Sequence, residues 1–139
     1  MYGADDPVVL ANDLPAPTGL YVAGDDLYVG DRDLGQIRLV ARNGEALSEP
    51  EIVADGLDAP EGFVVAENGI VVVEAAAARI VHLDGDRNRR VLAEMPAGSP
   101  GAPGLPPSQI FNGIAMDDDG NLFITGESAR VLYRIKAPW

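Results

Sequence analysis

The feature that most constrains the fold of this 139-residue chain is an internal repeat with a period of 43 residues. When the sequence is shifted by 43, Pro7–Asp31 falls on Pro50–Glu74 without a gap. A third copy begins at Val91, is interrupted by residues 96–109, and resumes at Asn112. Repetition at this period is typical of similar structural units that bury their apolar faces against one another.

Each copy of the repeat predicts four short β-strands. Apolar and β-branched residues alternate in segments of three to five residues, and Asn68-Gly69 and Asp119-Gly120 supply hairpin turns between the second and third segments. The expected strands are residues 8–11, 19–23, 27–30 and 37–40; 52–54, 62–66, 70–73 and 80–83; and 91–93, 113–117, 122–125 and 132–135.

Four-stranded antiparallel units of this length are typical of β-propeller blades. We therefore expect an all-β fold of three four-stranded antiparallel blades, half of a six-bladed β-propeller, in a single domain over residues 1–139. The repeats span about 7–49, 50–89 and 90–139, the last with the insertion 96–109. A sandwich or barrel of twelve strands is the alternative, but it would not require such close repetition.

One local signal conflicts with this interpretation. The four alanines of Ala75–Ala78 favour a helix by intrinsic propensity. They occupy the repeat position of Arg32–Gly35, which lies between two predicted strands, and three valines precede them. Because tertiary context commonly overrides propensity, the repeat predicts a turn here.

Three blades leave two apolar sheet faces open, and propellers close with 4–8 blades. The predicted strand order begins with an outer strand, Val8–Ala11, and ends on a third strand, Leu132–Ile135, with no outer strand after it. Pairing of these two segments across two chains would give a head-to-tail homodimer with six blades. A fragment or engineered half of a longer six-bladed chain is the competing explanation.

Composition disfavours some classes of binding partner, but it does not identify the cellular compartment. The formal net charge of −12 disfavours binding to nucleic acid. No apolar run approaches the roughly 20 residues that cross a bilayer, and the acidic start of the chain lacks the features of a signal peptide, so we expect a soluble protein without a membrane partner. The absence of cysteine excludes disulfides and thiolate metal sites.

Two segments suggest a family. Pro60-Glu61-Gly62-Phe63, and Phe111–Asp117 together with Asp119–Thr125, resemble the six-bladed gluconolactonase and senescence-marker-protein (regucalcin) family. They are also similar to the wider NHL and strictosidine-synthase-like propellers. The resemblance implies a divalent cation, usually calcium, in the central channel, held in part by a glutamate before one glycine and an asparagine before another. Glu61 and Asn112 occupy these motif positions.

The repeat independently places three residues together. Thr18, Glu61 and Asn112 each precede the glycine that starts an innermost strand, so they should converge on the propeller axis. Their hydroxyl, carboxylate and amide oxygens suit a hard cation such as calcium. The further ligand of the resembled family, an aspartate that also serves as catalytic base, has no counterpart among these three positions.

The connections after the third strand should lie on the same face of the propeller. We expect Asp31 and Glu74 as possible channel-lining residues, while Arg32, Asp33 and Glu127 belong to the same loops. The Pro/Gly-rich segment 96–109 should drape near the channel mouth, as a lid, a specificity loop or a tolerated insertion.

Two weaker signals have ordinary structural interpretations. Asp117–Asn121 is similar to the start of an EF-hand, but it lacks the following loop and its glutamate, which favours a hairpin turn. His82 has no second histidine in the chain and is expected to pack in the fold or lie at the surface.

These observations favour a lactonase-like propeller with an axial calcium site, in which the cation activates water toward a small lactone or ester and polarises its carbonyl. The alternatives are a non-catalytic NHL-type binding or scaffold propeller, and a propeller similar to glutaminyl cyclases. The last reading rests on Asn112–Ala115, Phe123–Gly126 and Leu132–Ile135, but the Trp-Pro element of those enzymes is missing.

Overall fold

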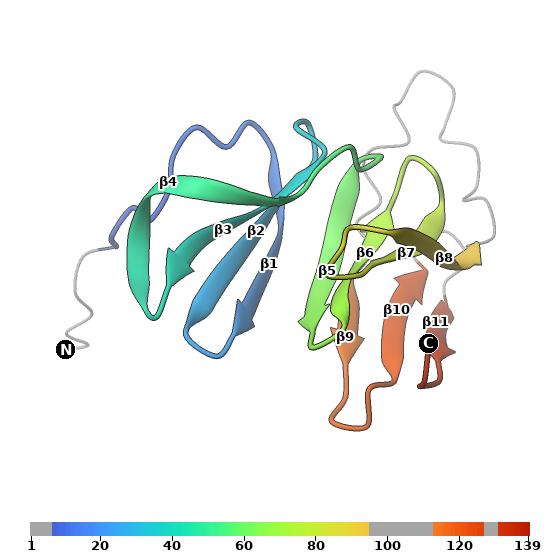
Figure 1. Cartoon of the computed structure of the whole chain (residues 1–139). Coiled ribbons are helices and arrows are strands. Elements are labelled where there is room, and N and C mark those ends of the chain that lie inside the picture. Colours follow the sequence, from blue (N-terminus) through green and yellow to red (C-terminus); the bar gives the residue numbers. More distant parts are fainter. Residues whose placement is uncertain (1–6, 95–112, 127–130) are drawn as a thin grey trace, which may run out of the picture.

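The computed structural model describes residues 7–94, 113–126 and 131–139, and within them the chain forms three antiparallel β-sheets (Figure 1). Sheet 1 contains β1 to β4, sheet 2 contains β5 to β8, and sheet 3 contains β9 to β11. The strands are β1 Pro17–Ala23, β2 Asp26–Asp31, β3 Gln36–Arg42, β4 Glu45–Ala54, β5 Pro60–Ala66, β6 Gly69–Glu74, β7 Arg79–Leu83, β8 Arg89–Glu94, β9 Ile114–Met116, β10 Leu122–Gly126 and β11 Val131–Ile135.

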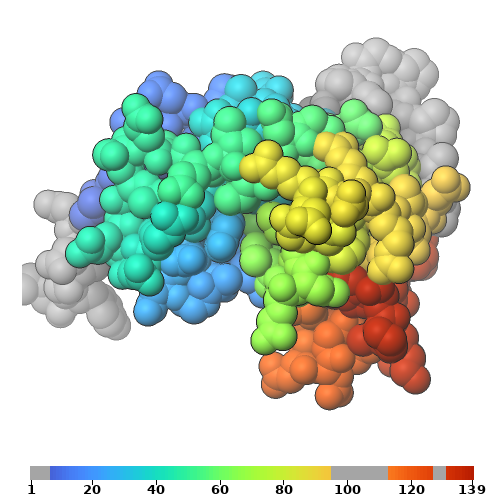
Figure 2. Space-filling view, viewed as in Figure 1, coloured from blue at the N-terminus to red at the C-terminus, as the bar shows by residue number. Residues whose placement is uncertain are grey.

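Within each sheet the strands follow one another in chain order, so every sheet is a meander. The first strand of each sheet lies beside the first strand of the next, since β5 packs against both β1 and β9. Sheets 1, 2 and 3 therefore succeed one another around an arc, coloured from blue through green to red in Figures 1 and 2. This is the radial arrangement that the repeat predicted.

Two hydrophobic clusters hold the arc together. One lies between sheets 1 and 2 and contains Ile37, Phe63 and Val72. The other lies between sheets 2 and 3 and contains Ile80 and Ile124. Sheet 2 is thus covered on both faces, whereas sheets 1 and 3 each contribute one face to a cluster.

The turns agree with the sequence. Hairpins join β1 to β2, β5 to β6 and β9 to β10 at the predicted Gly/Asp/Asn positions. Ala75–Ala78 forms a turn between β6 and β7, and the helix that propensity favours is absent there. The register of Glu74 opposite Arg79 explains this, because the two strands need a four-residue connection at that point.

One predicted strand is absent from the single chain. Val8–Ala11 is coil, and its apolar side chains are largely exposed. A strand requires a neighbour to hydrogen-bond with, and among the described residues this segment pairs with no strand. Sheet 3 has three strands within the described ranges and ends at β11, as the sequence predicted.

The described residues include no helix that is long and apolar enough to cross a membrane.

Candidate functional site

The starts of the innermost strands β1 and β5 lie against each other. The Thr18 hydroxyl donates a hydrogen bond to the Pro60 carbonyl oxygen at 2.9 Å, joining sheets 1 and 2. Gly19 permits this approach, because a Cβ at that position would collide with the backbone carbonyl of Glu61. The segments that carry Thr18 and Glu61 are therefore neighbours, as the repeat predicted.

Glu61 is a buried acidic residue, and only 2% of its surface is exposed. The β5–β6 pairing shifts register between Pro60 and Phe63, so Glu61 sits in an irregular stretch at the start of its strand. A carboxylate at this depth is not a solvated loop residue, and its burial requires compensating polar or ionic interactions.

Asn112 lies outside the described residues, so its position as a ligand stays a prediction. The neighbouring Gly113 backbone N–H donates to the Thr125 hydroxyl oxygen at 2.8 Å.

Asp31 and Glu74 occupy equivalent repeat positions and share one structural role. Both are fully buried. The Asp31 carboxylate accepts hydrogen bonds from the backbone N–H groups of Ala16 and Leu34, at 3.1 and 3.0 Å. Each carboxylate thereby ties the segment before an innermost strand to the end of the second strand.

The Glu74 carboxylate adds an ion pair to the same arrangement. It accepts from the Asp58 N–H at 3.0 Å and from the Arg79 guanidinium at 2.5 Å, with Arg89 at 3.9 Å. The hydrogen bond to Glu74 raises the pKa of Arg79 above its ordinary value. Sequence reasoning missed this pair, although Glu74 and Arg79 flank a four-residue turn and so stand opposite each other.

The other loop residues that the structure describes add no further candidate site. Asp33 is exposed, and the Arg32 N–H donates to the Ala16 carbonyl oxygen. Glu127 and the segment 96–109 lie outside the described residues. Within the described ranges, no group of three or more His, Asp or Glu side chains is arranged to hold a metal ion.

His82 has a packing role, as expected. Its Nε2 lies 2.8 Å from the Asn68 carbonyl oxygen, which can only accept, so Nε2 carries the proton. The ring also meets Trp139 edge-on, with 5.1 Å between ring centroids.

The acidic segment Asp117–Asn121 is a hairpin turn, as expected. The Asp117 carboxylate accepts from the backbone and side-chain amides of Asn121 and from the Asp119 N–H. These hydrogen bonds, chiefly the one from the Asn121 side chain, lower the pKa of Asp117. The segment lines a hollow at the hairpin end of the sheets, together with Glu67 and Trp139.

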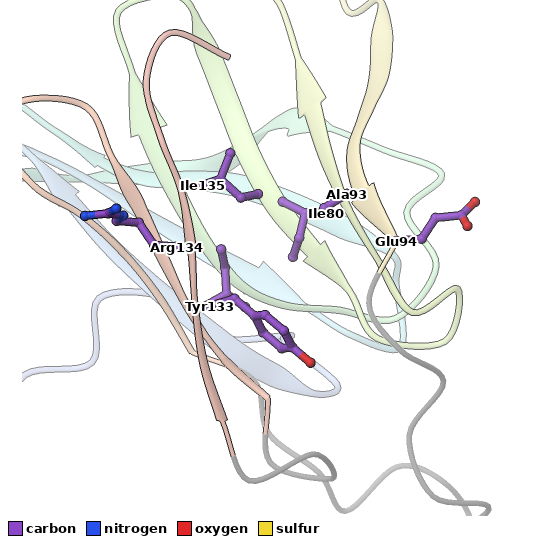
Figure 3. Close-up of a pocket in the computed structure, with 7 residues that line it drawn as sticks. Ile80, Ala93, Glu94, Tyr133, Arg134 and Ile135 are labelled. Carbon is purple, nitrogen blue, oxygen red and sulfur yellow. The ribbon is translucent and has the colours of Figure 1, made fainter.

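A second hollow, of about 170 Å³, lies between the outer strands of sheet 2 and the edge of sheet 3 (Figure 3). Figure 3 shows Ile80, Tyr133 and Ile135 gathered around it, while Arg134 and Glu94 extend outward on opposite sides. Its lining is mainly apolar, which suits a hydrophobic side chain.

Comparison with solved structures places this architecture. A streptogramin B lyase superimposes with a TM-score of 0.55 and 16% identity, over 88% of this chain and 41% of the lyase chain. Virginiamycin B lyase from Staphylococcus aureus gives 0.53 and 12%, over 91% and 43%. A catalytically inactive variant of that enzyme with quinupristin gives 0.53 and 14%, over the same shares.

The chain has a β-propeller fold. At these identities the likeness concerns the fold alone, and the propeller segment spans about two-fifths of the length of each lyase. No protein-family model and no curated protein matches the sequence. The comparisons thus support the propeller in the family resemblance, while membership of the gluconolactonase group stays a prediction.

Proposed function

We propose that this propeller segment carries part of an axial divalent-cation site, with calcium as the ion, and acts as a lactonase-type hydrolase on a small lactone or ester. The observation that carries the proposal is the burial of Glu61 at the start of the innermost strand of the middle blade. A carboxylate in that place supplies the anionic oxygen that a hard cation prefers.

The donor chemistry fits the ion. The Thr18 hydroxyl lies at the start of the neighbouring innermost strand, within hydrogen-bonding distance of the backbone just before Glu61. Asn112 occupies the matching place in the third repeat. Hydroxyl, carboxylate and amide oxygens suit a hard cation, and a cation bound by them would polarise an ester carbonyl.

Calcium titration by calorimetry tests the site. We expect the wild-type chain to bind calcium, and Glu61→Gln to weaken binding at least about tenfold, since an anionic ligand is replaced by a neutral one. Glu67→Gln is the matched control, because it removes the same charge from the exposed β5–β6 turn. Equal affinity in wild type and Glu61→Gln, with an unchanged circular dichroism spectrum, would exclude Glu61 as a ligand.

A second candidate function is ligand binding without catalysis. The Asp31 and Glu74 carboxylates are occupied by backbone and guanidinium donors, and neither is exposed for proton transfer. Hydrolysis of a lactone releases an acid. The fall in pH with simple lactones, measured with and without calcium, therefore separates the two candidates. Calcium binding without lactone turnover would favour the non-catalytic propeller.

A further inference from the structure

In each sheet we call the face toward the next sheet in chain order the forward face, and the face toward the preceding sheet the rear face. Residues at equivalent repeat positions on the three forward faces differ sharply in exposed fraction. Ile37 of sheet 1 and Ile80 of sheet 2 are 0% and 1% exposed, because the next sheet covers each of them. Their counterpart Leu132 in sheet 3 is 66% exposed. The third sheet thus retains the apolar residue that the first two use to bind a following blade.

The rear faces show the same pattern at the other end of the arc. Phe63 of sheet 2 is 3% exposed, and its ring lies against Gly19 and Gly30 of sheet 1. Its counterpart in sheet 3, Ile114, packs into the cluster between sheets 2 and 3. The counterpart in sheet 1, Leu20, is 66% exposed.

The two open faces are the repeat equivalents of faces that pack against each other elsewhere in the chain. The rear face of sheet 1, with Leu20, is the repeat equivalent of the faces with which sheets 2 and 3 cover their predecessors. The forward face of sheet 3, with Leu132, is the equivalent of the faces that are covered. We propose that a second copy of this chain covers both, so that sheet 1 of each copy packs on sheet 3 of the other.

The same interface explains the coil Val8–Ala11. In the repeat, the strand that precedes an innermost strand completes the preceding blade, as the end of β4 does before β5 and β8 does before the segment of β9. Val9, Leu10 and Ala11 hold this position before β1. In the assembly they add a fourth strand beside the partner subunit's β11, which is the last strand of its sheet among the described residues.

The register of this added strand follows from the two complete blades. In sheet 2, Val81 stands opposite Val91 and Ile80 stands opposite Ala93. The equivalent pairing puts Val9 opposite Tyr133 of the partner subunit and Ala11 opposite Leu132 of the partner subunit. Tyr133 borders the apolar hollow beside β11, so Val9 arrives at the edge of that hollow (Figure 3).

Three sheets from each of two copies give six blades, which lies within the range of 4–8 blades that closed propellers have. A closed pair would also complete the axial channel, because each copy then contributes its own Thr18 and Glu61. This inference stands independently of the proposed cation site, since it predicts association whether or not calcium binds.

A charge-exchange experiment with light scattering tests the interface. We expect Leu20→Lys alone and Leu132→Glu alone to be monomers at micromolar concentration, since each places a charge in an apolar contact. Mixed in equal amounts, they should form a dimer, because one interface then pairs Lys with Glu and the other remains apolar. Val91→Lys, on the outer strand of the middle blade, is the control that stays dimeric.

Two residues of the same segment test the donated strand. Val8 has the acidic Glu51 as its repeat counterpart, whereas Leu10 has Val53, which packs against the cluster between sheets 1 and 2. We expect Leu10→Asp to weaken dimerisation about tenfold and Val8→Asp to leave it within about twofold. A monomeric wild-type chain, an unrestored mixture, or equal effects at residues 8 and 10 would overturn the proposal.

Discussion

The Thr18 hydroxyl donates a hydrogen bond to the Pro60 carbonyl oxygen across the boundary between the first two sheets. This contact joins two innermost strands that are 42 residues apart in the sequence. The contact lies beside Glu61 of the candidate cation site. Because it joins two sheets, its removal tests how those sheets pack.

We expect Thr18→Val to lower the free energy of unfolding by about 1 kcal/mol, because the carbonyl of the buried Pro60 loses its side-chain donor. Thr125→Val is the control, since the Thr125 hydroxyl bonds to Gly113 within one sheet at an exposed position where water can replace it. Urea denaturation measures both. Equal losses of unfolding free energy in the two variants would mean that the Thr18–Pro60 hydrogen bond stabilises the fold no more than an exposed hydrogen bond within one sheet.

Glu74 and Glu51 form ion pairs of different depth. Glu74 is fully buried against Arg79, while Glu51 and its partner Arg42 are about half exposed. We expect Glu74→Gln to cost about 2 kcal/mol of stability and Glu51→Gln less than about 1 kcal/mol. A chemical denaturation series compares the two, and a larger loss at Glu51 would contradict the assigned role of Glu74.

The β2–β3 and β6–β7 turns contain equivalent residues of different type. Gly35 and Ala78 both have left-handed backbone angles, with φ of 63° and 50°. Because a Cβ in this conformation is strained, we expect Ala78→Gly to raise stability by about 0.5–1 kcal/mol.

Gly35→Ala should have the opposite effect, since its Cβ would also lie 2.5 Å from the Leu57 carbonyl oxygen. Thermal unfolding of the two variants measures both effects. A destabilised Ala78→Gly variant would show that the turn is shaped by the alanine side chain.

Asp117 should titrate below 3.8, the ordinary value for an aspartate, because three amide hydrogen bonds favour its charged form. A carboxyl whose folded pKa is lowered stabilises the fold above its unfolded pKa and loses that contribution as the pH falls through the folded value. Carboxyl NMR titration measures the midpoint. Asn121→Ala should raise it, and a wild-type midpoint at or above 3.8 would contradict the described turn.

The repeat made the architecture predictable to a large extent. It gave the order of the strands in each sheet, the hairpin positions, and the turn at Ala75–Ala78 against the helix propensity of its alanines. These features depend on local spacing and on apolar alternation, which one sequence displays directly.

The site was less predictable, because function depends on how side chains are used once the sheets are packed. Asp31 and Glu74 were candidates for the channel, yet their carboxylates bind backbone N–H groups and Arg79 inside the fold. A strand at Val8–Ala11 requires a neighbouring strand to pair with. The spacing of residues along one sequence does not identify that neighbour.

A cross-link between the two chains tests the two-copy ring most directly. The chain has no cysteine, so Val9→Cys with Tyr133→Cys introduces a single defined pair. Residues directly opposite on antiparallel strands have Cβ atoms about 4.5–5.5 Å apart, close enough for oxidation to join them with small adjustments.

We predict that the oxidised protein migrates on a non-reducing gel as a covalent dimer of two 14.6 kDa chains, while Val8→Cys with Tyr133→Cys stays mainly uncross-linked. Oxidised Val9→Cys with Tyr133→Cys that migrates only as the single chain would contradict the ring.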